Sequence, residues 1–544
     1  MRDPVRGHLE THGAERFPLR TLRDHLRHEG MPRPGEVAAL AERHGMTPAM
    51  LRGLLSYFTE LQHPHPGLRV CRGTSCLLAG GWTPPRAPAG PGQEHPVYCL
   101  GYCDRGPAAL RGESTLLLPR ARGTPSDVPL PCAVHCLGRE ALVTARLLHG
   151  DATTLEAARE QGAWRQLQEA LRGTPEAVLR AVEESGERGR GGAGFPTGAK
   201  WRRCAAAPPG ERYVIANGDE GDPGSFVDRE LMERDPHGVL EGMALCGYAV
   251  GAHEGILFVR AEYPHARARL EAAIAEARAA GLLGERILGS GFSFDVSVFS
   301  GLGSYVCGEE TALLNTLEGR RGEVRLRPPY PAEAGLFGRP TVVNNIETLR
   351  NVPEIVRLGG RAYRAIGTAA SSGTKVLCFN HAFARPGLLE VEFGTPLRAV
   401  LDAAGAPADL EAVLIGGPMG SLVFPEDFDV PVCYGAFTAR RMVLGHGGVV
   451  GLGRGTDWLG LLRHLLHFAR DESCGKCVPC RMGSQRACDL VEDRPRRADE
   501  ERLRMVLDTM QQASLCAFGQ LTPGPVLQIL DRYGAAIFDP GARR

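Results

Sequence analysis

Three cysteines, each separated from the next by two residues, stand near the end of the chain. In the stretch ESCGKCVPC they are Cys474, Cys477 and Cys480. This spacing lets one loop bind three irons of a 4Fe–4S cluster, while a structural zinc ion held by four cysteines is the alternative. Both centres need a fourth ligand. Cys488 is near in sequence but falls within a predicted charged helix, whereas Cys516 follows a long predicted helix that can fold back.

A second group of cysteines lies early in the chain. The runs VCRGTSC and CLGYC contain a C-x₄-C pair and a C-x₃-C pair, and their members are Cys71, Cys76, Cys99 and Cys103. Four thiolates in two pairs suit a 2Fe–2S cluster. The insert WTPPRAPAGPGQEHP separates the pairs and is too rich in proline for regular structure. The alternative is a domain that has lost its cluster and is retained as a docking surface.

The chain has 544 residues, 16 cysteines and a formal net charge of zero. Its first residues lack a signal-peptide core, and no apolar run reaches the roughly 18–20 residues of a membrane helix. We therefore expect a cytoplasmic protein without membrane insertion or nucleic-acid binding, whose cysteines serve metal or redox chemistry. Cys132 and Cys136 form a further C-x₃-C pair, which we interpret as core residues or as substitute cluster ligands.

The densest glycine segment is GERGRGGAGFPTGAKW, residues 186–201. It matches neither a P-loop nor a clean dinucleotide fingerprint. Its glycines still let the main chain approach a flat or phosphorylated ligand, and its cations suit an anion. A flexible surface loop is the alternative. The candidate ligand-binding residues here are Gly189, Arg190, Gly191, Gly192 and Lys200.

Three later motifs place amide and acidic side chains at predicted strand ends and helix starts. Such groups suit the hydroxyl, N–H and C=O groups of a flavin, and strand ends are the usual ligand position in an open α/β sheet. For the acids of CGEET, where we expect a helix from about Thr311, a simple helix-start preference is the alternative. The candidates are Asn217, Asp219 and Glu220, then Gly308, Glu309 and Glu310, then Asn344, Asn345 and Thr348.

The elements that must position these residues follow from the hydrophobic pattern. Helices are predicted over residues 15–62, and strand-like runs such as RYVIAN, GILFVRA and FDVSVF alternate with helices from 189 to 365. A small β-rich fold around one helix is predicted for 373–435, and helices from 456 onward. The predicted domains are 1–150, 151–370, 371–440 and 441–544.

These motifs resemble, in order and spacing, the flavin-bearing NADH dehydrogenase subunit of respiratory complex I. Its relatives in soluble NAD-reducing hydrogenases and NAD-dependent formate dehydrogenases share the pattern, and the resemblance spans residues 174–537. The early cysteine runs resemble the thioredoxin-like 2Fe–2S subunit, here fused in front, and 373–435 resembles a β-grasp module. The implied fold is an α/β multidomain protein: N-terminal helices, a thioredoxin-like domain, a Rossmann-like FMN-binding domain, a β-grasp module and a helical 4Fe–4S bundle.

The resemblance assigns roles to the candidate residues, and it selects Cys516 as the fourth cluster ligand. The positions that correspond to FMN-binding residues are Gly189, Gly191, Lys200, Asn217, Asp219, Gly308, Asn344, Asn345 and Thr348. Those around the flavin face where nicotinamide stacks are Phe195, Glu220, Tyr305, Glu309 and Glu310. Glu309 and Glu310 are expected to disfavour an anionic product of hydride transfer and to help NAD release. Arg203 replaces an aromatic residue near the adenine, and Asp222 replaces a glutamate.

The implied function is that of a diaphorase subunit. NAD(H) exchanges a hydride with FMN, and a 4Fe–4S cluster exchanges single electrons with partner subunits. The sequence contains no visible molybdopterin or nickel site, so the partners are a substrate-oxidising molybdopterin or hydrogenase subunit and a small 2Fe–2S subunit. We expect an NAD-dependent formate dehydrogenase first, and an NAD-reducing hydrogenase or complex I as alternatives. A zinc-stabilised assembly scaffold without redox activity is the rival from another class.

Overall fold

The computed structural model describes residues 18–65, 67–81, 94–118, 131–492 and 496–539. The chain divides into two compact units, each assembled from separate segments. Unit 1 comprises Met1–Gly67, Arg139–Glu220 and Val227–Thr374, and unit 2 comprises Leu68–Gly138, Gly221–Phe226 and Lys375–Arg544. Most of the predicted proline-rich insert lies outside the described residues. In the described ranges, every helix is too short or too polar to cross a membrane.

A parallel four-stranded sheet forms the centre of unit 1, as the alternating pattern predicts. Its strand order is β8-β7-β6-β9, and all neighbouring strands are parallel. Because the chain leaves β6 towards β7 on one side and reaches β9 on the other, the sheet has a topological switch point beside β6, where such sheets bind ligands. The strands are β6 (Tyr213–Gly218), β7 (Glu254–Val259), β8 (Asp295–Ser300) and β9 (Thr341–Asn345).

Helices surround this sheet. The central pair, α13 and α17, pack against each other and against β6. A two-stranded hairpin, β10 (Gly367–Thr368) and β11 (Ser371–Ser372), follows the last helix. The helices from residue 145 onward in unit 1 are α7 (Ala145–Leu148), α8 (Leu155–Glu160), α9 (Arg165–Ala170), α10 (Pro175–Ser185), α11 (Thr197–Ala205), α12 (Val227–Arg234), α13 (Pro236–Val250), α14 (Pro264–Ala279), α15 (Glu310–Leu317), α16 (Pro331–Ala334), α17 (Ile346–Leu358) and α18 (Gly360–Arg364), with 3₁₀ turns η2 (Ile287–Gly289), η3 (Tyr305–Gly308) and η4 (Leu336–Gly338).

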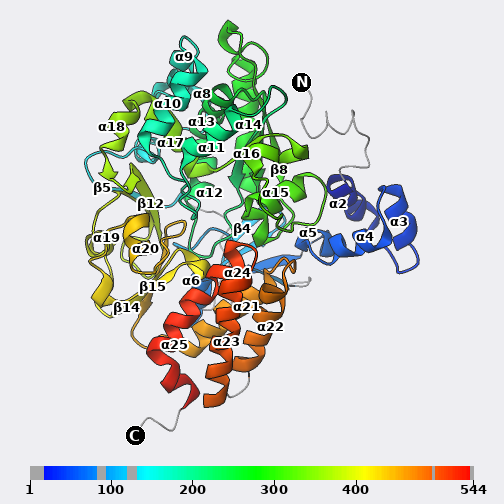
Figure 1. The fold of residues 1–544 in the computed structure, drawn as a ribbon, viewed down its shortest axis with the longest axis vertical. Helices are drawn as coiled ribbons and strands as arrows, with labels where there is room; N and C mark the ends of the chain where they lie inside the picture. Colours follow the sequence, from blue (N-terminus) through cyan, green and yellow to red (C-terminus); the bar gives the residue numbers. More distant parts are fainter. Residues whose placement is uncertain (1–17, 66, 82–93, 119–130, 493–495, 540–544) are drawn as a thin grey trace. The chain divides into compact units, whose positions relative to one another are not determined.

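Four N-terminal helices belong to unit 1 and share its core. The Thr47 hydroxyl caps the third of them by accepting a hydrogen bond from the Met50 N–H at 3.2 Å, as the Thr-Pro pair predicts. One buried cluster joins their leucines to Tyr213 and Ile215 of β6 and to Leu313 of α15. The prediction grouped these helices with the thioredoxin-like domain, whereas here they complete the core beside the parallel sheet. They are α2 (Pro18–Glu29), α3 (Val37–Arg43), α4 (Pro48–Leu55) and α5 (Thr59–Gln62) (Figure 1).

Unit 2 begins with a small mixed sheet of order β2-β1-β3-β4, in which β1 pairs parallel with β2 and antiparallel with β3. It contains the early cysteines and one short helix. The elements are β1 (Leu68–Cys71), α6 (Thr74–Ala79), β2 (Glu94–Val97), β3 (Ala108–Arg111) and β4 (Ser114–Leu117).

A six-stranded sheet of order β15-β14-β16-β12-β13-β5 forms the second part of unit 2. Two of its strands come from outside the predicted 371–440 module: β16 and β5, which pairs parallel with β13. Cys136 lies on this β5, which is the edge strand of the sheet, and Cys132 stands two residues before the strand begins. The elements are β5 (Val134–Leu137), β12 (Thr374–Phe379), β13 (Gly387–Glu392), α19 (Leu397–Ala404), β14 (Leu410–Ile415), η5 (Gly417–Met419), β15 (Ser421–Val423), η6 (Pro425–Asp427), α20 (Tyr434–Ala439) and β16 (Gly448–Gly453).

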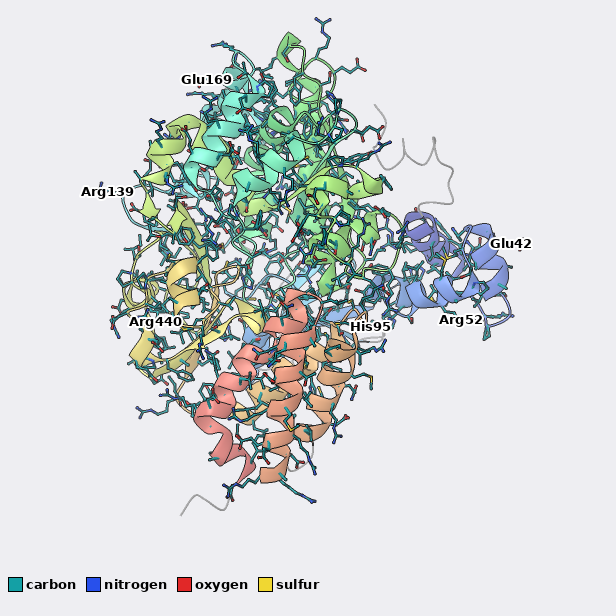
Figure 2. All side chains as sticks on the ribbon, in the orientation of Figure 1. Glu42, Arg52, His95, Arg139, Glu169 and Arg440 are labelled. Atoms are coloured by element: carbon teal, nitrogen blue, oxygen red, sulfur yellow. The ribbon has the colours of Figure 1, made fainter. Side chains whose placement is uncertain are left out.

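The chain closes with the predicted helical bundle. Four long helices run side by side around a core of leucines, and a short helix precedes the last of them (Figure 1). The side chains along these helices are drawn in Figure 2. The helices are α21 (Trp458–Asp471), α22 (Val478–Glu492), α23 (Arg497–Ala513), α24 (Ala517–Leu521) and α25 (Pro523–Phe538).

Candidate functional site

The C-terminal end of β6 meets the turn before α15, as the motifs predict. The Asn217 side-chain amide donates to the Gly308 carbonyl at 2.8 Å, and its oxygen accepts from the Asp219 N–H at 3.1 Å. A Cβ added to Gly308 would lie 3.1 Å from the Asp219 carbonyl oxygen. The two motifs therefore approach so closely that a glycine is needed between them.

The paired asparagines at the end of β9 have different tasks. Asn344 is buried, and its side-chain oxygen accepts from the Trp201 indole N–H at 2.8 Å. Asn345 caps α17 by accepting from the Thr348 N–H at 3.2 Å, and its amide donates to Asp228. Both side chains are thus held in one orientation at the switch point.

The glycine loop lies against this strand end. The Arg190 N–H donates to the Thr348 hydroxyl at 2.9 Å, and a Cβ on Gly191 would lie 3.0 Å from the Asn345 Cβ. Gly192 and Gly194 have φ angles of +115° and +59°. The glycine loop and the end of β9 form a cradle in which main chain is exposed in place of side chains. This cradle fits a flat phosphorylated molecule such as FMN at the end of a parallel sheet.

The Arg190 side chain does not occupy the cradle, contrary to the prediction that it adds a cation there. It is 1% exposed, and its Nη2 donates to Glu187, to the Tyr363 hydroxyl and to the Ser372 carbonyl. The guanidinium anchors the loop from behind, and only the main chain of this residue is directed to the strand end.

The two glutamates of CGEET separate into a cap and an ion pair. Glu309 accepts hydrogen bonds from the Thr311 and Ala312 N–H groups at 2.9 Å each, so it caps α15, the alternative that the sequence left open. Glu310 begins the helix, and its carboxylate lies 3.0 Å from Lys200 Nζ and 3.1 Å from Arg327 Nη1. The pair Lys200–Glu310 therefore combines two predicted site residues from distant motifs.

Glu220, which the resemblance places around the flavin face, caps a helix. Its buried carboxylate accepts from the Asp228 and Arg229 N–H groups at 3.1 and 3.0 Å, which caps α12. Asp219 instead lies 3.6 Å from Arg260. The acid nearest the strand end is thus Asp219, while Glu220 stabilises the following helix.

Two aromatic residues remain for stacking. Phe195, within the glycine loop, is 52% exposed, an unusual state for a phenylalanine. Tyr305 is half-buried in η3, immediately before the Gly308 turn. Both residues lie close to glycines of the candidate site in sequence, and aromatic rings are suited to stacking on a planar ligand.

The late cysteines form one group that includes Cys516. Burial raises the pKa of Cys480 to about 12, and the negative charges of Cys477, Cys516 and Cys474 contribute to that rise. A Cβ on Gly519 would lie 3.0 Å from the Cys480 Cβ, so α24, which directly follows Cys516, packs closely against the first turn of α22. Burial also raises the pKa of Cys488 to about 12, but its charged neighbours are Arg470 and Asp471. The donor set therefore fits a four-thiolate cluster with Cys516 as the fourth ligand.

The early cysteines form two contacting pairs. Cys71 is hydrogen-bonded to Cys76, and Cys99 Sγ lies 3.5 Å from Cys103 Sγ. Ligand sulfurs on one tetrahedral metal with bonds of about 2.3 Å are separated by about 3.8 Å, so each pair suits one iron of a two-iron cluster. No three Cys, His, Asp or Glu side chains in the described ranges are grouped to hold a single ion.

Main-chain N–H groups point at these early sulfurs. Gly73 N–H donates to Cys71 Sγ at 3.4 Å and Gly101 N–H to Cys99 Sγ at 3.3 Å. The hydrogen bond from Cys76, aided by N–H groups, lowers the pKa of Cys71 to about 7. Since such donors stabilise thiolates and tune cluster potentials, the site has the surroundings that a 2Fe–2S cluster needs.

Within unit 2 the two cysteine groups are connected by side chains. The Tyr98 hydroxyl donates to Asp471 at 2.8 Å, and the Thr74 hydroxyl lies 3.1 Å from His464 Nε2. Burial lowers the pKa of His464 to about 4, so this imidazole is neutral at pH 7. The Tyr98 ring also packs edge-on to Phe468 at 5.2 Å. The thioredoxin-like sheet is thereby joined to the bundle by polar and aromatic contacts.

Sequence reasoning missed several residues that position the site. Trp201 orients Asn344, Asp228 orients Asn345, and Arg327 pairs with Glu310. Trp201 stood at the end of the glycine motif, where an indole N–H next to a glycine loop is a usable signal. Asp228 and Arg327 carry no local signal, because neither partner is identifiable from the neighbouring residues.

Comparisons with known proteins agree with this geometry. The family model described as the Nuo51 FMN-binding domain matches residues 182–354, and that of the NADH-ubiquinone oxidoreductase-F iron-sulfur binding region matches residues 460–538. The chain is 43% identical over 375 residues to the NADP-reducing hydrogenase subunit HndC of Solidesulfovibrio fructosivorans, covering 68% of this chain and 76% of that protein. The chain belongs to this family of NADH dehydrogenase and diaphorase subunits.

Two further relatives show how far the family likeness extends. An NADH-quinone oxidoreductase subunit of Rhizobium meliloti is 42% identical over 367 residues, which are 66% of this chain and 87% of that one. A chain of an NAD⁺-reducing [NiFe]-hydrogenase in the H₂-reduced state superposes with a TM-score of 0.80 at 31% identity, covering 96% of this chain and 93% of that chain. The protein is thus an oxidoreductase subunit with an FMN-binding domain and a 4Fe–4S region, and the zinc scaffold alternative is wrong.

A methyl group at Gly191 tests the cradle. We expect Gly191→Ala to lower the flavin content per chain several-fold, because the added Cβ would lie 3.0 Å from the Asn345 Cβ and fill ligand space. Flavin is measured by absorbance after denaturation. Gly291→Ala, at a position with nothing within 4 Å of the added Cβ, is the control and keeps full flavin. Undiminished flavin in Gly191→Ala contradicts the assignment of the cradle.

The fourth cluster ligand is tested by two alanine variants. Cys516→Ala should lose about four irons per chain, because a cubane cluster with three thiolates is labile. Cys488→Ala should keep them, since Cys488 is grouped with charged residues and not with cysteines. Iron analysis and electron paramagnetic resonance of both proteins measure the difference. The reverse result would assign Cys488.

Proposed function

We propose that this chain is the diaphorase module of a larger redox complex, in which NAD(H) reacts at the cradle and electrons leave or enter through the late cysteine group. The observation that carries the proposal is the convergence of the glycine loop with the ends of β6 and β9, where Gly191 and Gly308 leave main chain exposed. FMN, when bound, exchanges a hydride with NAD(H) and single electrons with an iron–sulfur centre.

The flavin is proposed to lie in the cradle. Main-chain groups of the glycine loop and of the Gly308 turn contact it, while Asn217 and Asp219 bind its polar edge. Lys200, which donates to the Val343 carbonyl at 2.8 Å, places a positive charge at the strand end. The proposed FMN contacts are Gly189, Gly191, Gly192, Lys200, Asn217, Asp219, Gly308, Asn344, Asn345 and Thr348.

The dinucleotide is proposed to enter between Phe195 and Tyr305. Their rings would restrict the nicotinamide to a plane, with the carboxylates of Glu309 and Glu310 beside it. Because Lys200 and Arg327 neutralise Glu310, while the Glu309 carboxylate accepts helix N–H groups, neither carboxylate presents an uncompensated charge to a bound nucleotide.

Two clusters are proposed in unit 2. Cys474, Cys477, Cys480 and Cys516 ligate a 4Fe–4S cluster, and Cys71, Cys76, Cys99 and Cys103 ligate a 2Fe–2S cluster. Such clusters carry one electron at a time. The thiolates of the first group gain support from the N-terminus of α22, which begins between Cys477 and Cys480.

We propose an NAD-dependent formate dehydrogenase as the parent complex, with a molybdopterin subunit and a small 2Fe–2S subunit as partners. The 2Fe–2S-type domain fused in front of the flavin domain favours a formate dehydrogenase complex as the parent, rather than complex I with a separate flavin subunit. An NAD-reducing hydrogenase is the second candidate, because a hydrogenase chain matches over 96% of this chain.

Optical spectroscopy tests the module itself. The purified protein should show flavin bands over a broad iron–sulfur absorption, and NADH should bleach both under argon because the electrons reach flavin and clusters. NADPH serves as the comparison nucleotide. A colourless protein, or one whose spectrum NADH leaves unchanged, contradicts the proposed reaction.

The parent complex is tested by isolating the tagged chain with its native partners. Formate should drive NAD⁺ reduction by that complex, and molybdenum should copurify, because electrons from a formate-oxidising subunit reach this chain. Reduction of NAD⁺ by H₂ but not by formate would assign the hydrogenase instead. The measurement is the rate of NADH formation with each donor.

A further inference from the structure

The segment after α4 rests on the glycine turn that leads into η3. The N–H groups of Thr59 and Glu60 donate to the carbonyls of Gly303 and Leu302 at 3.2 and 3.1 Å. These N–H groups open α5, where the first N–H groups of a helix have no partners inside it. The turn at residues 301–304 therefore completes the helix, and the helix in return fixes two consecutive carbonyls of the turn.

Tyr57 adds a second connection at the same place. Its hydroxyl accepts from the Ser304 hydroxyl at 2.7 Å and donates to the Gly322 carbonyl at 2.8 Å. The Arg321 guanidinium lies over its ring, 4.5 Å from the centroid. One side chain from the N-terminal helices thus joins the turn 301–304 to the turn 320–323.

Both turns are packed without free space. Gly303 has a φ of +72°, and an added Cβ would lie 3.1 Å from the Thr59 Cβ. A Cβ on Gly322 would lie 2.8 Å from Cys307 Sγ and 3.2 Å from Tyr57. Since neither turn has a regular ladder of its own, their positions depend on these contacts.

The two turns flank the acidic pair of the site. Tyr305 to Gly308 follow Ser304 directly as η3, and Glu309 caps the next helix. Beyond Gly322, the Arg325 N–H donates to the Thr311 hydroxyl at 2.8 Å, and Arg327 lies 3.1 Å from Glu310. A displacement of either turn would therefore move groups on both sides of the dinucleotide site.

We propose that Tyr57 is a positioning residue for dinucleotide binding, and that the N-terminal helices act as a clamp on the segment 301–323, which runs from one turn through α15 to the other. The inference rests on the proposed function, because it takes Tyr305, Glu309 and Glu310 as the dinucleotide side of the site. The clamp orders a glycine-rich turn before the nucleotide binds. The entropic cost of ordering that turn therefore does not reduce the free energy of nucleotide binding.

The test is Tyr57→Phe in the full-length, flavin-loaded protein. The variant keeps the ring and loses both hydrogen bonds. We expect the dissociation constant for NAD⁺ and the KM for NADH to rise about fivefold to tenfold, with kcat towards an artificial one-electron acceptor within about twofold. Flavin content should equal that of the parent, since Gly308 is the one proposed FMN contact in the clamped segment, and the Asn217 amide still donates to its carbonyl.

Tyr248→Phe is the matched control. It also removes one tyrosine hydroxyl, which donates to the Gly173 carbonyl at 3.2 Å, away from the segment 301–323. Trypsin cleavage measures the order of the turn 320–323 independently of enzyme turnover, because the Arg320 side chain in that turn is 67% exposed. Cleavage after Arg320 or Arg321 should be faster in Tyr57→Phe than in Tyr248→Phe at equal thermal stability.

Ser304→Ala closes a double-mutant cycle. If the Tyr57 and Ser304 hydroxyls act together as one clamp, the double variant Tyr57→Phe/Ser304→Ala should bind NAD⁺ with the same affinity as whichever single variant binds it less tightly. Additive losses, unchanged NAD⁺ affinity in Tyr57→Phe, or equal losses in Tyr248→Phe each overturn the inference. A parent protein that neither binds nor oxidises NADH would instead overturn the proposed function.

Discussion

One buried cation determines where the glycine loop lies. Arg190 is almost fully enclosed, and its guanidinium is held by Glu187, by the Tyr363 hydroxyl and by the Ser372 carbonyl. An uncompensated charge at this depth costs about 3–5 kcal/mol, so the loop keeps the conformation that preserves these partners. Because Tyr363 belongs to α18 and Ser372 to β11, elements outside the parallel sheet fix the position of the cradle.

Helix capping fixes the orientation of several polar residues of the candidate site. Glu220, Glu309 and Asn345 each stand where a strand end or turn leads into a helix, and each accepts the first free N–H groups of that helix. These contacts avoid the cost of leaving helix N–H groups without acceptors. Each of these caps holds its side chain in one orientation next to the candidate site.

Local sequence patterns predicted most of the helices and strands, but they did not predict contacts between residues far apart in the sequence. RYVIAN, GILFVRA and FDVSVF became β6, β7 and β8, and the Thr47-Pro48 cap formed, because both signals reside in a few neighbouring residues. The choice of Cys516 came from family resemblance, and the grouping of charges around Cys480 agrees with it. The buried position of the Arg190 side chain and the packing of the N-terminal leucines beside β6 depend on distant partner residues. Hydrophobic periodicity does not identify such partners.

The pairing of β5 with β13 has a consequence for biosynthesis. Leu388 to Val391 are made some 250 residues after their strand partners at Val134 to Leu137. The ribosome therefore completes every segment of unit 1 by Thr374, before the second half of unit 2 exists. Flavin insertion can precede the synthesis of the helical bundle, whereas the proposed late cysteine group is complete only after Cys516 has followed Cys480 out of the ribosome. Until β13 is made, β5 lacks its partner strand, and an unpaired strand is open to pairing with other chains.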